Sequence, residues 1–200
     1  MGCLARMNFH KANWSELTHA YGDASDVPQL IQSIQSSDED EREEALDELY
    51  SNIWHQGTVY EATVKALPVL LELYIKKKVI DLDGLAFLII LIADGKGYHQ
   101  VHSQEENGSE IIELIRNEQE VVAQIRDIFE PNLALFLPYL EHENDDIRSN
   151  AACMFSQYPA HATITIPKIQ SALKKEVSEE VITHLEDCIE ELKNYNGPTK

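Results

Sequence analysis

A helix-pair module that recurs with the same internal spacing limits the folds available to this chain more than any other feature. Residues 26–53 read DVPQLIQSIQSSDEDEREEALDELYSNI, and residues 132–159 read NLALFLPYLEHENDDIRSNAACMFSQYP. When Arg42 is placed on Arg148, the apolar positions of the two segments coincide, which predicts helices with matching buried faces. The coinciding positions are Val27, Leu30, Ile31, Ile34, Ala45, Leu46 and Leu49 in the first copy and Leu133, Phe136, Leu137, Leu140, Ala151, Ala152 and Phe155 in the second. We therefore expect a stack of helix pairs, each packed mainly against its neighbours.

Two further segments repeat parts of this module. In residues 66–93 a proline again precedes a matching apolar stripe, and the helix expected over 81–93 is apolar on all sides, as is typical of a helix buried in the middle of an array. In residues 163–194, Pro167 stands where Pro28 stands in the first copy. The four segments predict an all-α fold of about four helix pairs plus extra helices.

The segments between these copies complete the predicted organisation. We expect a short opening helix over 13–22, an N-cap at Asp26, a link over 54–60 and a loop over 94–108. Ser109 is expected to cap a further helix that runs to about residue 129. The predicted limits are an N-terminal tail over 1–12, a single domain over 13–194 that contains the 94–108 loop as an insertion, and a C-terminal tail over 195–200.

The repeated residues resemble HEAT repeats. The shared marks are an early proline in the first helix and a D-x-R-x-x-A-L stretch that opens the second, present as Asp40-x-Arg42-x-x-Ala45-Leu46 and, nearly, at 146–152. The segment 14–74 also resembles a group of bacterial HEAT-like proteins, and the resemblance covers most of residues 14–193. It departs from the pattern in 66–93, which lacks the Asp and the Arg, and at Val181, which replaces the Arg. The resemblance implies a right-handed α-α superhelix whose second helices line a concave side, and it implies protein–protein binding.

The charge of the chain separates possible partners. Lys and Arg number 16 and Asp and Glu number 35, so the formal net charge is −19. This argues against nucleic-acid binding, which needs clustered cations, and it suits a basic protein partner.

Other sequence features bear on the compartment. The longest apolar run, residues 85–93, is too short to span a bilayer, and the N-terminus lacks a signal-like apolar stretch. Three cysteines without a CxxC pair suggest reduced thiols. We therefore expect a cytoplasmic protein with no membrane partner.

Acidic residues gather on two predicted second helices. Residues 38–48 carry eight acids and one Arg, and residues 176–191 carry seven acids and no Lys or Arg. They form either a negative groove for a basic partner or ordinary solvated faces with acids near helix starts. The partner-binding candidates on these helices are Glu43, Glu44, Asp47, Glu48, Glu179, Glu186 and Asp187.

The WHQGTVY link at 54–60 provides a second group of candidates. Trp54, His55 and Tyr60 form either a recognition patch, since Trp and Tyr are typical of binding hot spots, or a packed corner between helices. Gly57 permits the turn in both cases.

The 94–108 loop provides a third group. Tyr98 and His99 are candidates for partner contact, because long loops are often functional. Asp94, His99, His102 and the Glu105-Glu106 pair are metal-ligand types, but HxxH in a glycine-containing loop does not supply the geometry of a metal site. We expect no metal and no cofactor, with His99 and His102 as the weak metal candidates.

No nucleotide-binding, hydrolase or metalloprotease motif (GxxxxGK[ST], GxGxxG, GxSxG, HExxH) occurs in the chain. We therefore expect a non-catalytic binding scaffold for a basic protein, for example an immunity protein that neutralises a bacterial toxin. The alternative is an enzyme-associated regulator, or a HEAT-like protein with a metal or active site in the 94–108 loop.

Overall fold

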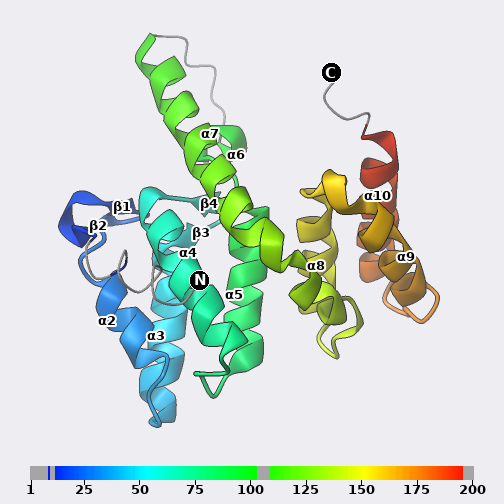
Figure 1. The fold of residues 1–200 in the computed structure, drawn as a ribbon, viewed down its shortest axis with the longest axis horizontal. Coiled ribbons are helices and arrows are strands. Elements are labelled where there is room, and N and C mark those ends of the chain that lie inside the picture. Colours follow the sequence, from blue (N-terminus) through cyan, green and yellow to red (C-terminus); the bar gives the residue numbers. More distant parts are fainter. Residues whose placement is uncertain (1–8, 10–11, 103–108, 196–200) are drawn as a thin grey trace. The chain divides into compact units, whose positions relative to one another are not determined.

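The computed structural model describes residue 9, residues 12–102 and residues 109–195 (Figure 1). Among these residues the regular structure is almost entirely helical, and the strands that occur form two hairpins of two-residue strands. The predicted all-α fold is therefore confirmed. No helix in the described part of the chain is both long and apolar enough to cross a membrane.

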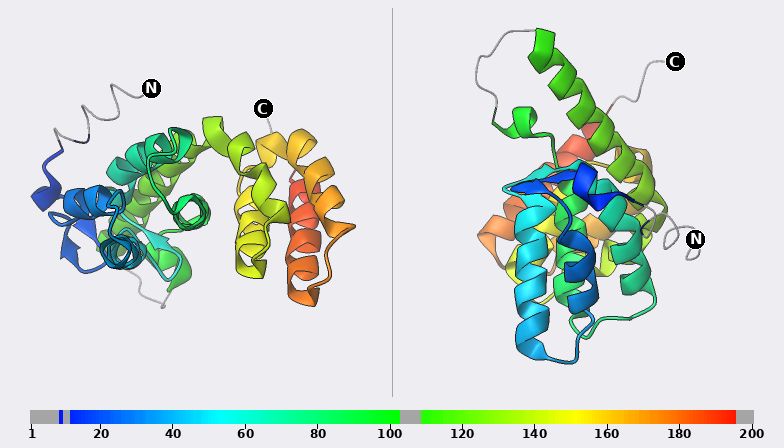
Figure 2. Two further views of the ribbon diagram at one scale, coloured as in Figure 1. Left: turned by 90° about the horizontal axis from the view of Figure 1, so that it is seen from below. Right: turned by 90° about the vertical axis from the view of Figure 1, so that its left-hand side faces the viewer.

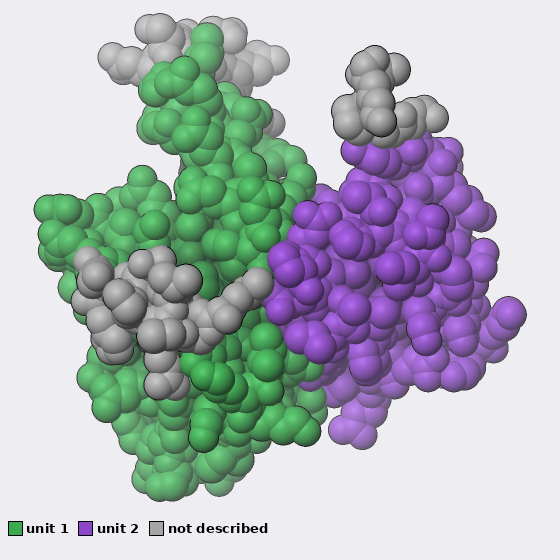
Figure 3. Space-filling view, in the orientation of Figure 1, with its two compact units in different colours: residues 1–129 green, residues 130–200 purple. Residues whose placement is uncertain are grey.

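The chain divides into two compact units, residues 1–129 and residues 130–200 (Figure 3). The side chains buried in the first are centred on the helices of 27–94, and those of the second on 133–192. We refer to them as unit 1 and unit 2. The domain limits expected from the sequence stay a prediction.

Unit 1 opens with a hairpin where a helix was expected. A 3-10 turn, η1 (Trp14–Glu16), is followed by β1 (Thr18–His19) and β2 (Gly22–Asp23), so the predicted helix over 13–22 is wrong. The amide of Ala20 donates to the carbonyl of Asn52 at 3.0 Å, and Gly22, which follows the turn, has a φ of 131° that favours glycine. A helix this short has little stability of its own, and these contacts decide the conformation.

Two helix pairs form the body of unit 1 (Figures 1 and 2). They are α2 (Val27–Ser33) with α3 (Glu39–Asn52) and α4 (Glu61–Ile75) with α5 (Leu82–Asp94). The helix predicted to be apolar on all sides is α5, and its residues 85, 86 and 88–93 are buried, as expected.

Polar side chains fix where the helices of unit 1 begin. The side chains of Asp38 and Asp81 accept backbone N–H groups in the first turns of α3 and α5, which satisfies donors that a helix start leaves open. Asp26 stands at the N-cap position of α2 without capping it. Its carboxylate instead bonds buried His19 at 3.1 Å and accepts from Asn52 at 2.7 Å, which ties the first hairpin to α3.

The link over 54–60 is a hairpin of β3 (Trp54–His55) and β4 (Thr58–Val59). Its two turn residues, Gln56 and Gly57, have φ angles of 49° and 88°, and positive φ at both positions is typical of a tight type I′ turn.

The segment after α5 is not all loop. A short helix, α6 (Tyr98–Val101), forms inside it, residues 103–108 lie outside the described residues, and α7 (Ser109–Phe129) follows. The N-terminal part of α7 projects beyond the paired helices of unit 1 (Figures 1 and 2), and Ile112 on it is 70% exposed.

Unit 2 contains the other two pairs. It runs through η2 (Glu130–Glu141), α8 (Asp145–Ser156), η3 (Pro159–His161), α9 (Ala162–Leu173) and α10 (Glu179–Asn194). Its first member was expected to be an α-helix but is a 3-10 helix, which contains Pro131 and Pro138. Phe136 and Phe155 are fully buried and form its core together with apolar residues of α10.

Candidate functional site

Two regions that the sequence singled out separately lie together in unit 1. Thr58 of the β3–β4 hairpin forms a β-bridge with Lys96, just before α6. The amide of Val59 donates to the carbonyl of Lys96 at 3.0 Å, and the amide of Lys96 donates to the carbonyl of Gly57 at 2.9 Å. These bonds fasten the 54–60 link to the start of the 94–108 segment. Side chains of these two regions, together with Tyr21 of the first hairpin, form a surface that we call the aromatic corner. Its residues are Tyr21, His55, Tyr60, Tyr98 and His99.

Tyr21 extends the aromatic corner from the first hairpin. Its hydroxyl lies 3.4 Å from Nδ1 of His55, and the two rings meet edge to face with centroids 5.4 Å apart. Tyr21 is 65% exposed. The sequence pattern did not indicate this residue, because it predicts a helix over 13–22, and only the hairpin brings Tyr21 to His55.

Tyr60 lies deeper in the aromatic corner. Burial raises the pKa of its phenol above the ordinary value, the hydrogen bond with Thr58 acts in the opposite direction, and nearby Tyr21, Tyr98 and Glu118 raise the pKa further. The hydroxyl of Thr58 lies 2.5 Å from that of Tyr60 and 2.7 Å from the carbonyl of His55, to which it donates. A hydroxyl has one donor hydrogen, so Tyr60 donates to Thr58.

His99 is held from two sides by Glu118 of α7. The backbone amide of His99 donates to Glu118 Oε2 at 3.0 Å, and its Nδ1 lies 2.8 Å from Glu118 Oε1. Tyr98 is 51% exposed, and its ring lies 4.7 Å from that of exposed His102. Glu118 is a second residue that the sequence did not indicate, since no local pattern links it to a site 19 residues earlier.

The weak metal candidates do not assemble into a set of ligands in the described residues. There, no group of three or more His, Cys, Asp and Glu side chains could hold a metal ion. His99 directs Nδ1 to Glu118, and His102 lies against Tyr98. Glu105 and Glu106 lie outside the described residues.

The link candidates are only partly accessible. Trp54, His55 and Tyr60 are all half-buried. Nδ1 of His55 faces the hydroxyl of Tyr21, and the hydroxyl of Tyr60 bonds that of Thr58. The exposed aromatic surface of the corner comes from Tyr21 and Tyr98.

The acids of α3 lie on the surface. Glu43, Glu44, Asp47 and Glu48 are exposed, as are the four acids at 38–41. Within the described part of the chain, none of these eight carboxylates forms an ion pair. Among the described residues, no ion pair therefore neutralises these carboxylates of α3.

The acidic segment of unit 2 is divided between two roles. Glu179, Glu186 and Asp187 of α10 are exposed, whereas the side chain of Glu176 is only 4% exposed and receives two bonds from Arg148. Those bonds lower the pKa of Glu176 to about 2. Glu176 therefore belongs to the interior, and the remaining acids form the solvated face.

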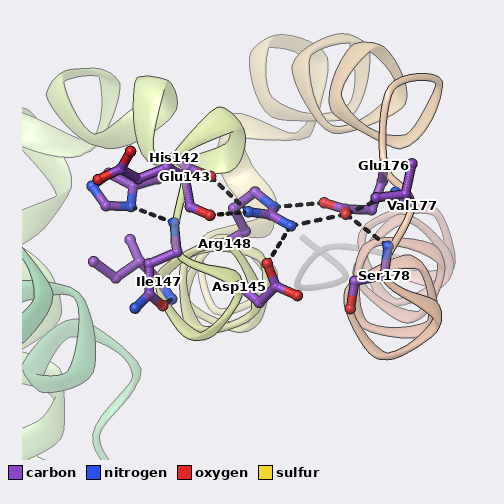
Figure 4. Close-up of polar contacts among 9 residues, drawn as sticks. His142, Glu143, Asp145, Ile147, Arg148, Glu176, Val177 and Ser178 are labelled. Atoms are coloured by element: carbon purple, nitrogen blue, oxygen red, sulfur yellow. Dashed lines mark hydrogen bonds and ion pairs between the residues drawn. The ribbon is translucent and has the colours of Figure 1, made fainter.

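Arg148 uses every hydrogen-bond donor of its guanidinium (Figure 4). Nη1 donates to the carbonyls of His142 at 2.7 Å and Glu143 at 3.0 Å, which fixes the turn before α8. Nε and Nη2 bind the two oxygens of Glu176 at 2.6 and 2.9 Å, and Nη2 also binds Asp145 at 2.7 Å. Arg148 thereby joins α8 to the turn between α9 and α10.

Comparisons with protein-family models, with curated proteins and with solved structures return no match to this chain.

Proposed function

We propose that this protein is a non-catalytic binding scaffold that holds a basic protein on the acidic surface of α3. The observation that carries the proposal is the row of exposed carboxylates on α3, which have no ion-pair partner in the described part of the chain. Unneutralised charge of one sign speeds the encounter with an oppositely charged partner and selects against partners of like charge. The net charge of −19 acts in the same direction.

The aromatic corner supports this proposal by supplying contacts of another kind. It begins where α3 ends, since Trp54 and His55 follow Asn52 within three residues along the chain. Exposed Tyr21 and Tyr98 provide the rigid amphipathic surface that dominates the energetics of many protein interfaces. We infer that carboxylates steer the partner and that the tyrosines hold it.

Neutralisation of a basic toxin by an immunity protein of the HEAT-like class, in the cytoplasm, is the form of this function that we favour. A small acidic chain without a catalytic motif suits a task that requires only tight binding. The partner in this function presents a cationic protein surface. A nucleic acid does not suit it, because its phosphates carry the same sign of charge as this chain.

The test compares two variants that remove the same charge. One carries Glu44→Gln, Asp47→Asn and Glu48→Gln on α3, and its control carries three exposed substitutions elsewhere. The control substitutions are Glu120→Gln, Asp127→Asn and Glu143→Gln. A basic protein captured from the native host is purified, and its Kd is measured against salt concentration.

We expect the wild-type affinity to fall as salt rises, because exposed charges are screened beyond about 10 Å at 0.1 M salt. The α3 variant should bind at least about tenfold more weakly, which corresponds to about 1.4 kcal/mol, and the control should bind nearly as the wild type does. Equal affinities for the two variants would sink the proposal, as would an affinity that salt does not change.

A further inference from the structure

Arg42 and Arg148 hold equivalent places in the two units. Each lies four residues after the N-cap of its helix, Asp38 for α3 and Asn144 for α8. Nη1 of Arg42 donates to the carbonyls of Ser36 at 3.2 Å and Asp38 at 3.1 Å, just as Nη1 of Arg148 binds the turn before α8. Both arginines therefore hold the turn that precedes their own helix by hydrogen bonds from Nη1.

The other edge of the guanidinium differs between the two arginines. Nε and Nη2 of Arg148 donate to the carboxylate of Glu176 (Figure 4). Nε of Arg42, by contrast, is buried and has no hydrogen-bond partner in the described residues. Its Nη2 likewise bonds none of these residues. Buried donors are nearly always satisfied, so an unsatisfied one in a native structure calls for a partner.

A pocket of about 170 Å³ lies beside Arg42. It is lined by Arg42, by the acids Glu39, Glu43 and Asp81, and by the apolar side chains Ile34, Leu46, Val79 and Leu85. The acids are exposed, so the pocket opens to solvent.

Val79 of unit 1 stands at the position that corresponds to Glu176 of unit 2. Val79 stands two residues before Asp81, the N-cap of α5, and Glu176 stands two residues before Ser178, the N-cap of α10. Valine cannot accept a hydrogen bond. Unit 1 therefore has a pocket and an unsatisfied arginine edge where unit 2 has a carboxylate.

The lining selects the chemistry of a ligand. The Nε and Nη2 edge of a guanidinium matches the two oxygens of a carboxylate. Three carboxylates around a single arginine repel a simple anion, so a ligand must also carry a positive charge. The pocket volume is below the roughly 300 Å³ at which pockets for drug-sized ligands begin, and it suits a single residue at the end of a polypeptide.

We propose that this pocket binds the C-terminal lysine or arginine of a basic polypeptide. The α-carboxylate pairs with Nε and Nη2 of Arg42 after a small rotation of that side chain, and the cationic side chain lies among Glu39, Glu43 and Asp81. This rests on the proposed function in taking the partner to be basic, and it adds which part of that partner is recognised.

The first experiment uses an N-acetylated tripeptide that ends in lysine, with a free carboxylate or with a C-terminal amide. Binding is followed by the Nε–H resonance of Arg42 in ¹H–¹⁵N spectra of the full chain. We expect saturable binding of the free carboxylate and at least about tenfold weaker binding of the amide, because the amide loses the charge-assisted pair. Equal binding of the two peptides would overturn the proposal. Free lysine that binds as tightly as the peptide would also overturn it, by making the ligand a small molecule.

Two substitutions at position 79 provide a matched pair. Val79→Glu places a carboxylate where Glu176 stands in unit 2, and it should fill the site and abolish peptide binding. Val79→Thr keeps the size without the charge and should retain binding. Melting curves identify any variant that fails to fold, and Arg42→Lys, which keeps the charge but loses the two-pronged edge, gives a second route to the same loss. Undiminished binding by folded Val79→Glu or by Arg42→Lys would refute the site.

The outcome is separable from the test of α3. The α3 variant leaves every residue that lines the pocket unchanged. A basic partner whose affinity falls in the α3 variant but not in Val79→Glu supports the acidic surface and overturns the pocket. Loss of peptide binding confined to Val79→Glu and Arg42→Lys, with equal affinities in the α3 variant and its control, supports the pocket and overturns the role of the acidic surface.

Discussion

At the scale of single residues, the two equivalent arginines show how one residue type acquires different roles. The spacing of the module places Arg42 and Arg148 in register, and both bind the turn that precedes their helix. The neighbour of the Nε and Nη2 edge lies outside the repeated segments that align the two arginines. It is Glu176 for Arg148 and Val79 for Arg42. A buried pair of this kind stabilises a unit only when both members are present.

Removing the carboxylate of the buried pair should destabilise unit 2. We expect Glu176→Gln to lower the free energy of unfolding by about 2 kcal/mol at neutral pH, because Arg148 then keeps only exposed Asp145 as a charged partner. Urea unfolding measures the change. The control is Glu190→Gln on the exposed face of α10, which should stay within about 0.5 kcal/mol of the wild type.

The same pair should make unit 2 sensitive to acid. Arg148 lowers the pKa of Glu176 from 4.5 to about 2 in the folded state. A carboxyl whose pKa is lowered on folding adds stability that is fully present above the unfolded pKa and is lost as pH falls through the folded one. The difference between the wild type and Glu176→Gln should therefore be constant from about pH 7 to pH 5 and shrink between about pH 4.5 and pH 2. A difference that is unchanged at the acid end would contradict this assignment.

At the scale of elements, the β3–β4 hairpin holds the aromatic corner in place. Its turn requires positive φ at two successive residues, and only Gly57 is a residue suited to that conformation. Gln56 adopts a φ of 49° that asparagine and glycine tolerate better.

Substitutions at these two turn positions should have opposite effects. Gly57→Ala should cost about 1 kcal/mol through the backbone alone, because a methyl group there meets no atom within 4 Å. Gln56→Asn should gain a few tenths of a kcal/mol at the left-handed position. Thermal unfolding measures both. The same Gln→Asn change at exposed Gln32 of α2 is the control, and there it should not stabilise, since asparagine is a poorer helix former.

At the scale of the whole molecule, the two compact units suggest separate cooperative behaviour. Each has its own fully buried side chains, Leu70 and Ile89 in unit 1 and Phe136 and Phe155 in unit 2. Regions with separate cores can open with separate free energies.

Creating a cavity in one core should therefore affect the units unequally. We expect Phe155→Ala to cost roughly 3–5 kcal/mol in unit 2 and to lower hydrogen-exchange protection across α8 and α10. Protection across α4 and α5 should change much less. Leu70→Ala in unit 1 is the reciprocal control, and an equal loss of protection in both units after either substitution would show that they unfold as one.

Part of the fold could be predicted from the sequence alone. The apolar period of α3, α5 and α8 predicted helices with buried faces, and the complete apolarity of 85–93 predicted that α5 is buried. The exposure of the acids on α3 also followed from their position opposite the apolar stripe. These properties can be read from spacing because they are local, since each depends on which face of one helix is turned to a core.

Only the tertiary structure decided the rest. Tyr21 reaches His55 through a hairpin that helical spacing did not predict, Glu118 reaches His99 from another helix, and Val79 leaves a pocket beside Arg42. Each of these pairings joins residues separated along the chain by 19 residues or more. The period of a helix specifies the face that is buried but not the residue that meets it, because that residue is determined by how all the elements pack together.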